Sequence, residues 1–383
     1  MAPPRDVEVA VIGAGVVGCA VALALTRKRV SVVLLEAEAA PALGASGTNS
    51  GILHQGFDSD PGELETALIH SSGIDREPLL TALGIPVVRC GALMRPLDGS
   101  QRDAVATVAA SARRNGVSVI ERDDGALEIP GEAVTDPVAY TLALAAEAER
   151  HGLDLLTRFR VRSIQPDARG LSLGSESGTT VHCRVAVNCA GLEGDTVARL
   201  VGDESFWIYP RKGEFLVFDP PAGERLERIL LPVPTERTRG VLVFPTIDGK
   251  VVAGPTAVDL EDKTDWSVRP EAREEIVSKA AALYPPLADA EPIFAYAGLR
   301  PAGRGVNYVI GLTPTCPQLV HAAAIRSTGL SASLGVAEYV TEIVGSLGVQ
   351  LSPTAPLRGG PPSEDEDRPW WRRTAEYRAE VTA

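Results

Sequence analysis

The sequence has few of the residues that would indicate a disulfide-bonded, zinc-binding or nucleic-acid-binding protein. Its 383 residues include only five cysteines, and no two of them form a CxxC pair. This scarcity argues against a disulfide framework or a zinc site and favours a reduced, cytoplasmic protein. Basic residues are also outnumbered, since 37 lysines and arginines face 50 aspartates and glutamates and leave a net charge of −13. A nucleic acid, whose phosphates would be repelled, is therefore not expected as a partner.

Long uncharged runs are scarce as well, and one of them lies close to the N-terminus. Residues 9–26 (VAVIGAGVVGCAVALALT) carry no charge, and their number is about the minimum for a membrane span. The preceding MAPPRDVE is too acidic to resemble the start of a signal peptide. The glycines inside the run favour a tight turn between a strand and a helix, so we expect no integral membrane segment.

This N-terminal region contains a dinucleotide-binding pattern. The β-branched runs Val7–Ile12 and Val30–Leu35 predict two buried parallel strands. Between them lies Gly13-Ala14-Gly15-Val16-Val17-Gly18, followed by good helix formers. In such a GxGxxG turn the first glycine permits the sharp bend, the second admits a pyrophosphate, and the third allows close packing of helix on strand. The helix N-terminus offers free N–H groups to the pyrophosphate.

A second cofactor-binding element follows the second strand. Glu36 lies about 20 positions after the glycines, where it can accept hydrogen bonds from a ribose. A glycine-rich loop, GASGTNSG at residues 44–51, can lay its backbone against a flat ring and bond it through hydroxyls and an amide. A second polar loop so early favours FAD over a nicotinamide cofactor. We predict FAD contacts from Gly13, Gly15, Val16, Val17, Gly18, Glu36, Ala37, Ser46, Thr48, Asn49, Ser50 and Gly51.

The rest of the chain predicts two interleaved domains. The Asp-Pro start and apolar spacing of residues 136–149 are typical of a crossover helix, and residues 157–164 and 185–191 are typical of strands that return to the cofactor domain. Between these segments, β-rich runs with proline and glycine turns predict a separate sheet that faces the flavin.

The predicted fold class is α/β (α+β overall), with a Rossmann-like FAD-binding domain interleaved with a β-sheet-based substrate domain. The FAD-binding domain is predicted to comprise residues 1–85, 136–205 and 294–350, and the substrate domain residues 86–135 and 206–293. Residues 351–383 have the composition of a linker and C-terminal tail. Trp370, Trp371 and Tyr377 in this tail could dock on the body or on another subunit, or the end could be disordered.

The sequence resembles the D-amino-acid-oxidase-like, FAD-dependent oxidoreductases, and within them the glycerol-3-phosphate oxidase/dehydrogenase and L-2-hydroxyglutarate dehydrogenase branch. The matching stretches are VIGAGVVG with Glu36, TNSGILHQGFD, VNCAGLEGDTVARLVG (187–202), PRKGEFLVFD (210–219), VLVFPTIDGKVVAGPTA (241–257), AGLRP (297–301) and IRSTGLSASLGVAEYV (325–340). The resemblance implies FAD as cofactor. Its adenine–ribose half would contact Val161, Ala190 and Gly191.

The stretch Ser327-Thr328-Gly329-Leu330-Ser331 precedes a predicted helix. The backbone N–H groups at a helix N-terminus would stabilise negative charge on the N1–C2=O edge of a reduced flavin. The alternative is an ordinary hydroxyl N-cap. Position in the chain and the resemblance favour the flavin role for all five residues.

Three residues are candidates for the chemistry at the flavin, where hydride would pass from a carbon to N5. His54 follows the glycine-rich loop at residues 44–51, called the flavin loop below, and a histidine side chain suits a general base. The alternative is a histidine that only packs. Arg300 can bind a carboxylate or phosphate through paired hydrogen bonds, and it is also predicted to touch the cofactor; the alternative is an interface salt bridge. Lys263 matches a basic position that some relatives use for phosphate, although a solvated lysine is an equal alternative.

The function predicted from these residues is oxidation of the secondary alcohol of a small anionic hydroxy compound, glycerol 3-phosphate or a 2-hydroxy acid. The electron acceptor would be oxygen, a quinone or another protein, and no metal site is expected. An amino-acid or amine oxidase on the same fold is the first alternative, because a fold does not determine chemistry. A non-catalytic or partner-dependent flavoprotein subunit is the second.

Overall fold

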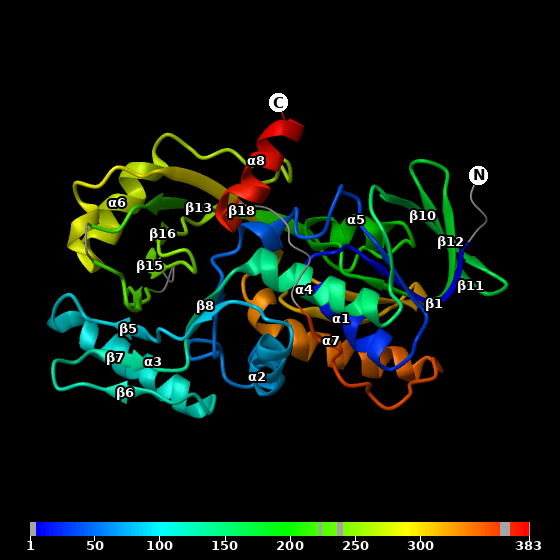
Figure 1. The fold of residues 1–383 in the computed structure, drawn as a ribbon, viewed down its shortest axis with the longest axis horizontal. Helices are drawn as coiled ribbons and strands as arrows, with labels where there is room; N and C mark the ends of the chain where they lie inside the picture. The colour runs from blue at the N-terminus through cyan, green and yellow to red at the C-terminus, as the bar shows by residue number, and fades with distance from the viewer. Residues whose placement is uncertain (1–4, 222–223, 236–239, 361–367, 383) are drawn as a thin grey trace.

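The computed structural model describes residues 5–221, 224–235, 240–360 and 368–382. Two lobes lie side by side along the long axis of the molecule (Figure 1). One lobe contains the N-terminal strand, and the other is built mainly from the middle of the chain. The chain passes between the lobes several times, so the predicted interleaving of a Rossmann-like domain with a second sheet is confirmed.

The first lobe is organised around a sheet with a parallel centre. Its strand order is β10-β11-β12-β1-β2-β9, with β20 beside the C-terminal part of β12 and β19 beside β20. Neighbours among β20, β12, β1, β2 and β9 run parallel, and the pairs that involve β10, β11 and β19 run antiparallel. The strands are β1 Arg5–Ile12, β2 Val32–Leu35, β9 Asp154–Leu156, β10 Val161–Asp167, β11 Gly170–Ser175, β12 Thr180–Asn188, β19 Val309–Thr313 and β20 Cys316–Ala323.

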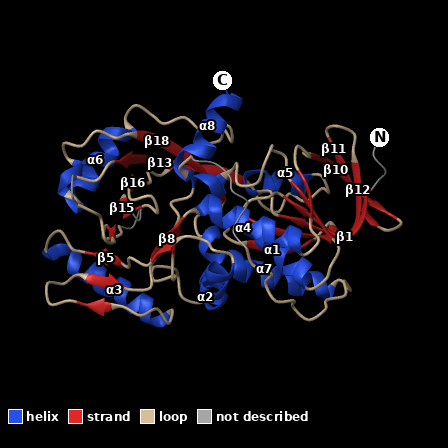
Figure 2. Ribbon diagram, viewed as in Figure 1, coloured by secondary structure: helices blue, strands red, loops and turns tan. Residues whose placement is uncertain are grey.

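Helices cover this sheet (Figure 2). They are α1 Val16–Arg27, α2 Leu64–Ala82, α4 Pro137–Arg150, α5 Gly194–Arg199 and α7 Gly329–Ser346, and α1 packs against both α4 and α7. The side chain of Asp136 accepts the N–H groups of Val138 and Ala139 at 2.8 Å, which caps α4 as its Asp-Pro start predicts. The uncharged run 9–26 is divided between β1, the glycine turn and α1. Across the described residues, no helix is long and apolar enough to span a membrane.

The second lobe contains the other large sheet. Its strand order is β17-β13-β16-β15-β14-β5-β7-β6, and β18 pairs with the other side of β13. The strands are β5 Ala92–Met94, β6 Ile120–Glu121, β7 Leu127–Ile129, β13 Ile208–Phe218, β14 Ile229–Leu231, β15 Leu242–Pro245, β16 Val251–Gly254, β17 Val258–Asp259 and β18 Phe294–Gly303. Helices α3 (Arg102–Arg114) and α6 (Ala272–Leu283) pack on this lobe.

Strand β18 lies at the junction of the lobes. It falls within the range 294–350 that the sequence assigns to the FAD-binding domain, yet it pairs with β13 from Ile208↔Gly303 to Val217↔Phe294. The next strand in the chain, β19, belongs to the first sheet. Arg300 is on β18 and is therefore held by the second sheet.

A small third sheet links the two lobes. Its order is β3-β8-β4, formed by β3 Ile52–Leu53, β8 Ala133–Thr135 and β4 Val87–Val88. The short 3₁₀ helices are η1 Ala45–Thr48, η2 Gly99–Gln101, η3 Gly191–Glu193 and η4 Pro285–Leu287. Pairing of β3 with β8 brings the segment after the flavin loop beside residues near position 132, which matters for the site.

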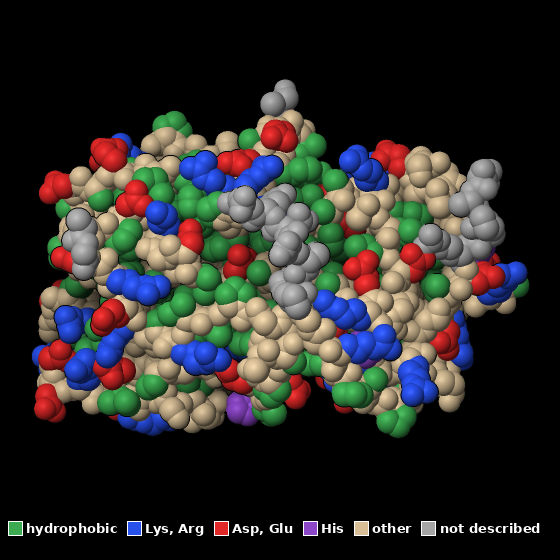
Figure 3. Space-filling view, viewed as in Figure 1, with side chains coloured by type: hydrophobic (Ala, Val, Ile, Leu, Met, Phe, Trp, Pro, Cys, Tyr) green, Lys and Arg blue, Asp and Glu red, His purple; other side chains and the backbone are tan. Residues whose placement is uncertain are grey.

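The C-terminal tail ends in a docked helix, α8 (Trp370–Thr382). Trp370 and Trp371 at its start are 4% and 3% exposed. Of the alternatives that the sequence left open, the structure shows the tail helix docked on the body of the chain. On the face seen in Figure 3, acidic and basic side chains are interspersed.

Candidate functional site

A cavity of about 840 Å³ runs along the junction of the lobes. Gly13 and Glu36 line it on the first lobe, at the carboxyl ends of β1 and β2, and Phe215 and Arg300 line it on the second. Open parallel sheets bind their ligands at this edge, because loops and helix N-termini gather there. The cavity therefore joins the predicted cofactor turn to the predicted substrate residues.

The β1–α1 turn has the geometry of a dinucleotide-binding turn. Gly13 has a φ of +101°, and a Cβ there would lie 2.5 Å from the carbonyl oxygen of Cys189. A Cβ on Gly18 would lie 1.9 Å from the carbonyl oxygen of Gly13. A side chain at Gly13 would meet the backbone that follows β12, and one at Gly18 would push α1 away from the end of β1, so each glycine allows a close approach at this turn.

Glu36 is held by backbone donors at the end of β2. Its Oε2 accepts the N–H of Ala14 at 2.7 Å, and its Oε1 accepts the N–H of Glu38 at 2.9 Å. Burial raises the pKa of the Glu36 carboxyl above its ordinary value, although these two N–H donors act in the opposite direction. The carboxyl lines the cavity close to the glycine turn, so it can meet a ribose in a ligand that lies across both.

The loop after Glu36 closes over the glycine turn. The hydroxyl of Ser46 in η1 accepts the N–H of Val16 at 2.9 Å, which joins η1 to the first residue of α1. Thr48 packs so closely against β18 that a Cβ on Gly298 would lie 2.8 Å from its Oγ1. The flavin loop is thus clamped between α1 and the second sheet.

Most of the predicted cofactor-binding residues line this one cavity. Those that do are Gly13, Gly15, Val16, Val17, Glu36, Ala37, Ser46, Thr48, Asn49, Ser50, Val161, Ala190, Gly191, Arg300, Ser327, Gly329 and Leu330. They come from the ends of β1 and β2, the loop of η1, the start of β10, η3, β18 and the start of α7. The glycine turn, the acidic residue and the polar loop fit an extended FAD molecule.

Gly18, Gly51, Thr328 and Ser331 are not among the described residues that line the cavity. A Cβ on Gly51, whose φ is +76°, would lie 2.3 Å from the carbonyl oxygen of Thr135. Thr328 donates its hydroxyl to Glu65 at 2.6 Å. These contacts direct Gly51 and Thr328 toward the protein interior, so the predicted contact of these two residues with FAD is not supported by their position.

His54 follows β3 and lines the cavity. Its Nδ1 lies 2.8 Å from Oε2 of Glu132, whose side chain is 0% exposed. The other oxygen of Glu132 accepts the N–H of Gln55 at 2.7 Å. Because an ionised carboxylate only accepts hydrogen bonds, Nδ1 carries the proton in the neutral imidazole and Nε2 carries the lone pair.

The backbone of His54 is fixed by residues of two helices. Its N–H donates to Oγ of Ser331 at 2.8 Å, at the start of α7. Arg76 on α2, which is 4% exposed, donates to the carbonyl oxygens of His54 at 3.4 Å and Ser331 at 2.6 Å. Ser331 and Arg76 therefore position the histidine from behind the cavity wall, which is a different role from the flavin contact predicted for Ser331.

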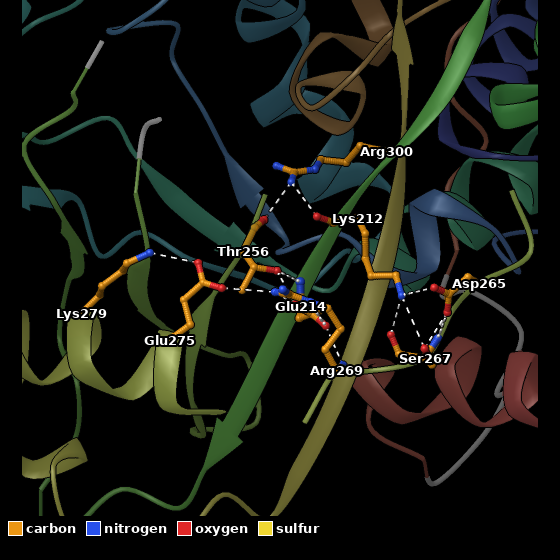
Figure 4. Close-up of polar contacts among 9 residues, drawn as sticks. All are labelled: Lys212, Glu214, Thr256, Asp265, Ser267, Arg269, Glu275, Lys279 and Arg300. Atoms are coloured by element: carbon orange, nitrogen blue, oxygen red, sulfur yellow. Dashed lines mark hydrogen bonds and ion pairs between the residues drawn. The ribbon is translucent and has the colours of Figure 1, made fainter. Parts of the chain in front are cut away.

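Arg300 is oriented by backbone carbonyl groups of the second sheet (Figure 4). Its Nε donates to Arg211 O at 3.1 Å, and its Nη2 donates to Thr256 O at 2.9 Å and Lys212 O at 3.3 Å. These three contacts set the plane of the guanidinium in the cavity wall.

A buried ionic network lies behind Arg300, as Figure 4 shows. Glu214 is 0% exposed, and both of its oxygens accept from Arg269. Thr256 donates its hydroxyl to Glu214 at 2.8 Å and presents its carbonyl oxygen to Arg300. Lys212, which is 1% exposed, is paired with Asp265 at 2.7 Å. The network fixes both carbonyl oxygens that Nη2 of Arg300 contacts.

Lys263 also lines the cavity, but its ammonium group is paired. Its Nζ lies 2.6 Å from Oδ1 of Asp195, whose side chain is 2% exposed. Burial acts to raise the pKa of Asp195, yet the bonds from Lys263 and from the N–H of Ile208 hold that pKa below its ordinary value. Lys263 is thus a tethered cation, neither a freely solvated lysine nor one directed only at the cavity.

Glu132, Arg76, Glu214 and Arg269 are the residues that sequence reasoning missed. Each acts on a predicted site residue through a contact between distant positions, such as the 78 residues that separate His54 from Glu132. Glu132 lies in the sequence IPGEAV, where an acidic residue beside a Pro-Gly turn ordinarily faces solvent. A charged residue inside an apolar strand, as Glu214 is in GEFLVF, is the one signal that could have indicated a buried pair.

The chain is similar in sequence to dehydrogenases that act on small hydroxy compounds. Over 360 residues the chain is 28% identical to a glycerol 3-phosphate dehydrogenase of Caloramator mitchellensis, covering 90% of this chain and 75% of the relative. Over 277 residues it is 26% identical to the mitochondrial L-2-hydroxyglutarate dehydrogenase of Mus musculus, covering 64% of this chain and 60% of the relative.

The fold is similar to that of a solved structure, and the sequence matches the model of one protein family. The dithionite-reduced L-α-glycerophosphate oxidase of Mycoplasma pneumoniae with FAD bound superposes with a TM-score of 0.85 and 22% sequence identity, covering 93% of this chain and 99% of that one. At this identity the likeness establishes the fold. The model of the DAO family, FAD dependent oxidoreductase, matches residues 8–343. This match spans most of the sequence, and the chain therefore belongs to the DAO family of FAD-dependent oxidoreductases.

Proposed function

We propose that this FAD-dependent oxidoreductase oxidises the secondary alcohol of a small anionic hydroxy compound, with glycerol 3-phosphate first and a 2-hydroxy acid second. The observation that carries the proposal is the pair of His54 and Glu132 in the wall of the cavity that also contains Arg300. A base and an anion-binding cation in one cavity are what such a substrate requires. The named activities of the relatives support the same reaction class.

The cofactor would be held by the residues that line the first-lobe part of the cavity. Gly13, Gly15 and the N-terminus of α1 would receive the pyrophosphate. Glu36 would bond the ribose, and Ala190 with Val161 would face the adenine half. When bound there, FAD supplies the hydride acceptor of the reaction.

His54 would act as the general base. Its Nε2 would take the proton of the substrate hydroxyl as the carbon–hydrogen bond is broken. Glu132 would stabilise the imidazolium that forms, because the negative carboxylate lies 2.8 Å from Nδ1. Gln55 and Ser331 would hold the pair in place through the backbone N–H bonds described above.

Arg300 would bind the phosphate or carboxylate of the substrate. A planar guanidinium can form two parallel hydrogen bonds to such a group, and the carbonyl contacts of β13 would keep it oriented. Lys263 would add positive charge to the same wall while Asp195 holds it in position. The N-terminus of α7, which presents Ser327 and Gly329 to the cavity, would favour negative charge near the reacting end of the cofactor.

The division of the chain follows from these roles. Residues 1–85, 136–205 and 294–350 would form the FAD-binding domain, except that β18 at its start pairs into the sheet of the substrate domain, which would comprise residues 86–135 and 206–293. Electrons would leave for oxygen, a quinone or another protein. A cytoplasmic setting belongs to the proposal on the sequence grounds given above.

The test is anaerobic mixing of the purified yellow holoprotein with single compounds, followed by flavin absorbance. The panel contains glycerol 3-phosphate, L- and D-2-hydroxy acids and several amino acids. Bleaching by a hydroxy compound, with loss of bleaching in His54→Gln at unchanged flavin content, supports the proposal. Bleaching by amino acids alone, or equal bleaching of the His54→Gln variant, overturns it. Admission of air to the bleached protein then separates an oxidase from a dehydrogenase.

A further inference from the structure

The C-terminal helix α8, red in Figure 1, is anchored on the second lobe by two tryptophans. The ring of Trp370 packs edge-on against Tyr296 at 5.9 Å, and the ring of Trp371 lies 5.4 Å from Phe294. The indole N–H of Trp371 donates to Asp248 at 3.2 Å. Both partners of the rings are on β18, the strand that carries Arg300. The helix is therefore fixed at its start to the junction of the two lobes.

From this anchor α8 crosses the loop that follows Glu36. The three successive carbonyl oxygens of residues 41–43 each accept a hydrogen bond from it. The donors are Arg373 Nη1 at 3.2 Å, Thr374 Oγ1 at 2.9 Å and Arg378 Nε at 2.7 Å. These carbonyl groups belong to a segment between β2 and η1 that has no helix or strand of its own. Side chains of α8 therefore provide hydrogen bonds that regular structure would otherwise supply.

The segment needs this support because its backbone is strained. Ala42 has a φ of +63°, a conformation that costs free energy for any residue with a Cβ and persists where its surroundings hold it. Its N–H donates to Ala14 O at 3.1 Å, inside the glycine turn. A Cβ on Gly47 would lie 2.0 Å from Thr374 Oγ1, so α8 packs directly on η1. Ala42 is thus bonded to α8 through its carbonyl oxygen and to the glycine turn through its N–H.

The far end of α8 forms part of the cavity wall. Arg378 and Val381 line the cavity together with Trp266, whose ring lies 4.9 Å from the Arg378 guanidinium. Nη1 of Arg378 is 3.2 Å from Oε1 of Glu38, and Tyr377 donates to the other oxygen at 2.8 Å. Two residues of α8 thereby hold the carboxylate that lies two positions after Glu36.

We propose that α8 is part of the FAD site. It holds residues 38–48 in the conformation that receives the cofactor, and Arg378 is both the residue that positions this loop and the cation that α8 contributes to the cavity wall. The diphosphate of FAD is its anionic part, and the loop that α8 holds contains Ser46 beside the pyrophosphate-binding turn. The tail is thus a cofactor-binding element, independent of which substrate the enzyme oxidises.

The experiment measures FAD binding to apoprotein by the quenching of flavin fluorescence, and FAD release from holoprotein by its recovery after dilution. Arg378→Ala removes the contacts of Arg378 with Leu43 O and Glu38 and leaves the tryptophan anchor in place. Arg372→Ala is the matched control, since Arg372 lies on the same helix, stacks on Phe294 and Trp371, and is absent from the described cavity lining. A chain that ends at Gly360 removes the whole helix. Circular dichroism of each apoprotein verifies that it is folded.

We expect Arg378→Ala to raise the dissociation constant for FAD by about tenfold to a hundredfold, the effect of losing hydrogen bonds to a charged group. The truncated chain should lose FAD faster still, and Arg372→Ala should bind like the parent protein. Arg378→Lys should recover little, because one ammonium cannot reach both Leu43 O and Glu38 as the forked guanidinium does. Equal FAD affinity of Arg378→Ala and Arg372→Ala in folded apoproteins would overturn the proposal, as would tight FAD binding by the folded truncated chain.

Discussion

The two ends of the cavity are built in different ways. At the cofactor end, Gly13 and Gly18 are separated by five positions, and what they supply is backbone conformation and space for close packing. At the end where we propose that the substrate binds, His54 and Arg300 are each held by ionised or polar groups from distant segments. The first end depends on the absence of side chains, and the second on side chains that meet only in the folded protein. Substitutions at the two ends should therefore fail in different ways.

The largest effect should come from filling the glycine turn. In Gly18→Val, the new Cβ would lie 1.9 Å from the carbonyl oxygen of Gly13, so α1 must move away from β1. We expect the purified protein to contain almost no FAD and to unfold at a lower temperature than the parent chain. Absorbance at the flavin band and thermal unfolding test this. Gly99→Ala is the control, because nothing lies within 4 Å of a Cβ there; equal flavin content in both variants would contradict the packing role.

Substitutions at the base should affect turnover and leave FAD in place. His54→Gln should lower kcat by about 10² to 10⁴, the usual contribution of a general base. Glu132→Gln should lower it by about 10-fold to 100-fold, because the amide can still accept the Nδ1 proton but cannot stabilise a cation. Steady-state kinetics at saturating substrate tests this, with flavin absorbance as the measure of bound FAD. A kcat of Glu132→Gln equal to that of the parent would show that the carboxylate does not act on the base.

The network behind Arg300 should make stability depend on pH. Burial acts to raise the pKa of Glu214, but the bonds from Arg269 and Thr256 hold it below its ordinary value. A carboxyl with a lowered folded-state pKa stabilises the fold above its unfolded pKa, and this contribution is lost as the pH falls through the folded value. Glu214→Gln should cost about 3 kcal/mol at pH 7, as breaking a buried pair does.

Urea unfolding at a series of pH values measures this difference. The gap between parent and Glu214→Gln should be widest near neutral pH and should close in acid. Glu291→Gln removes a comparable but exposed partner of Arg273 and serves as the control, with little change expected. A gap that is constant with pH would mean that the charge of Glu214 does not contribute. The KM of Glu214→Gln should also rise, because a weakened ion pair with Arg269 loosens the segment whose Thr256 carbonyl oxygen contacts Arg300.

The smallest effect is expected at Thr328, which lies between two residues of the described cavity lining but is not part of that lining itself. Its hydroxyl bonds to Glu65 at 2.6 Å and Tyr308 at 2.7 Å. Thr328→Val should therefore cost about 1 kcal/mol of stability through the lost hydrogen bonds. The dissociation constant for FAD should stay within about threefold of the parent value. Fluorescence titration of the apoprotein checks this, and a much larger loss of affinity would place Thr328 in contact with the cofactor after all.

The parts of the site that could be predicted from sequence share a physical cause. Gly13, Gly18 and Glu36 are favoured by the local geometry of a strand, a turn and a helix. Each of these residue types therefore occurs at a defined spacing in the sequence. The same holds for the capping of α4 by Asp136, where a Ser, Thr, Asp or Asn is favoured for local reasons. Thr328 and Ser331 illustrate the limit of this reasoning, because a hydroxyl at a helix start can bond a ligand or its own protein.

The strand–turn–helix cofactor motif, the interleaved α/β architecture and the groups suited to an anionic substrate could be predicted from the sequence, since they follow from local propensity and residue chemistry. The contacts by which Glu132 orients His54, Glu214 and Arg269 support Arg300, and α8 holds residues 41–43 became visible in the folded chain. These contacts join positions as far apart as 335 residues. Such pairs form because the packing of two sheets brings their segments together, and no local pattern in the chain records which distant side chain will be there.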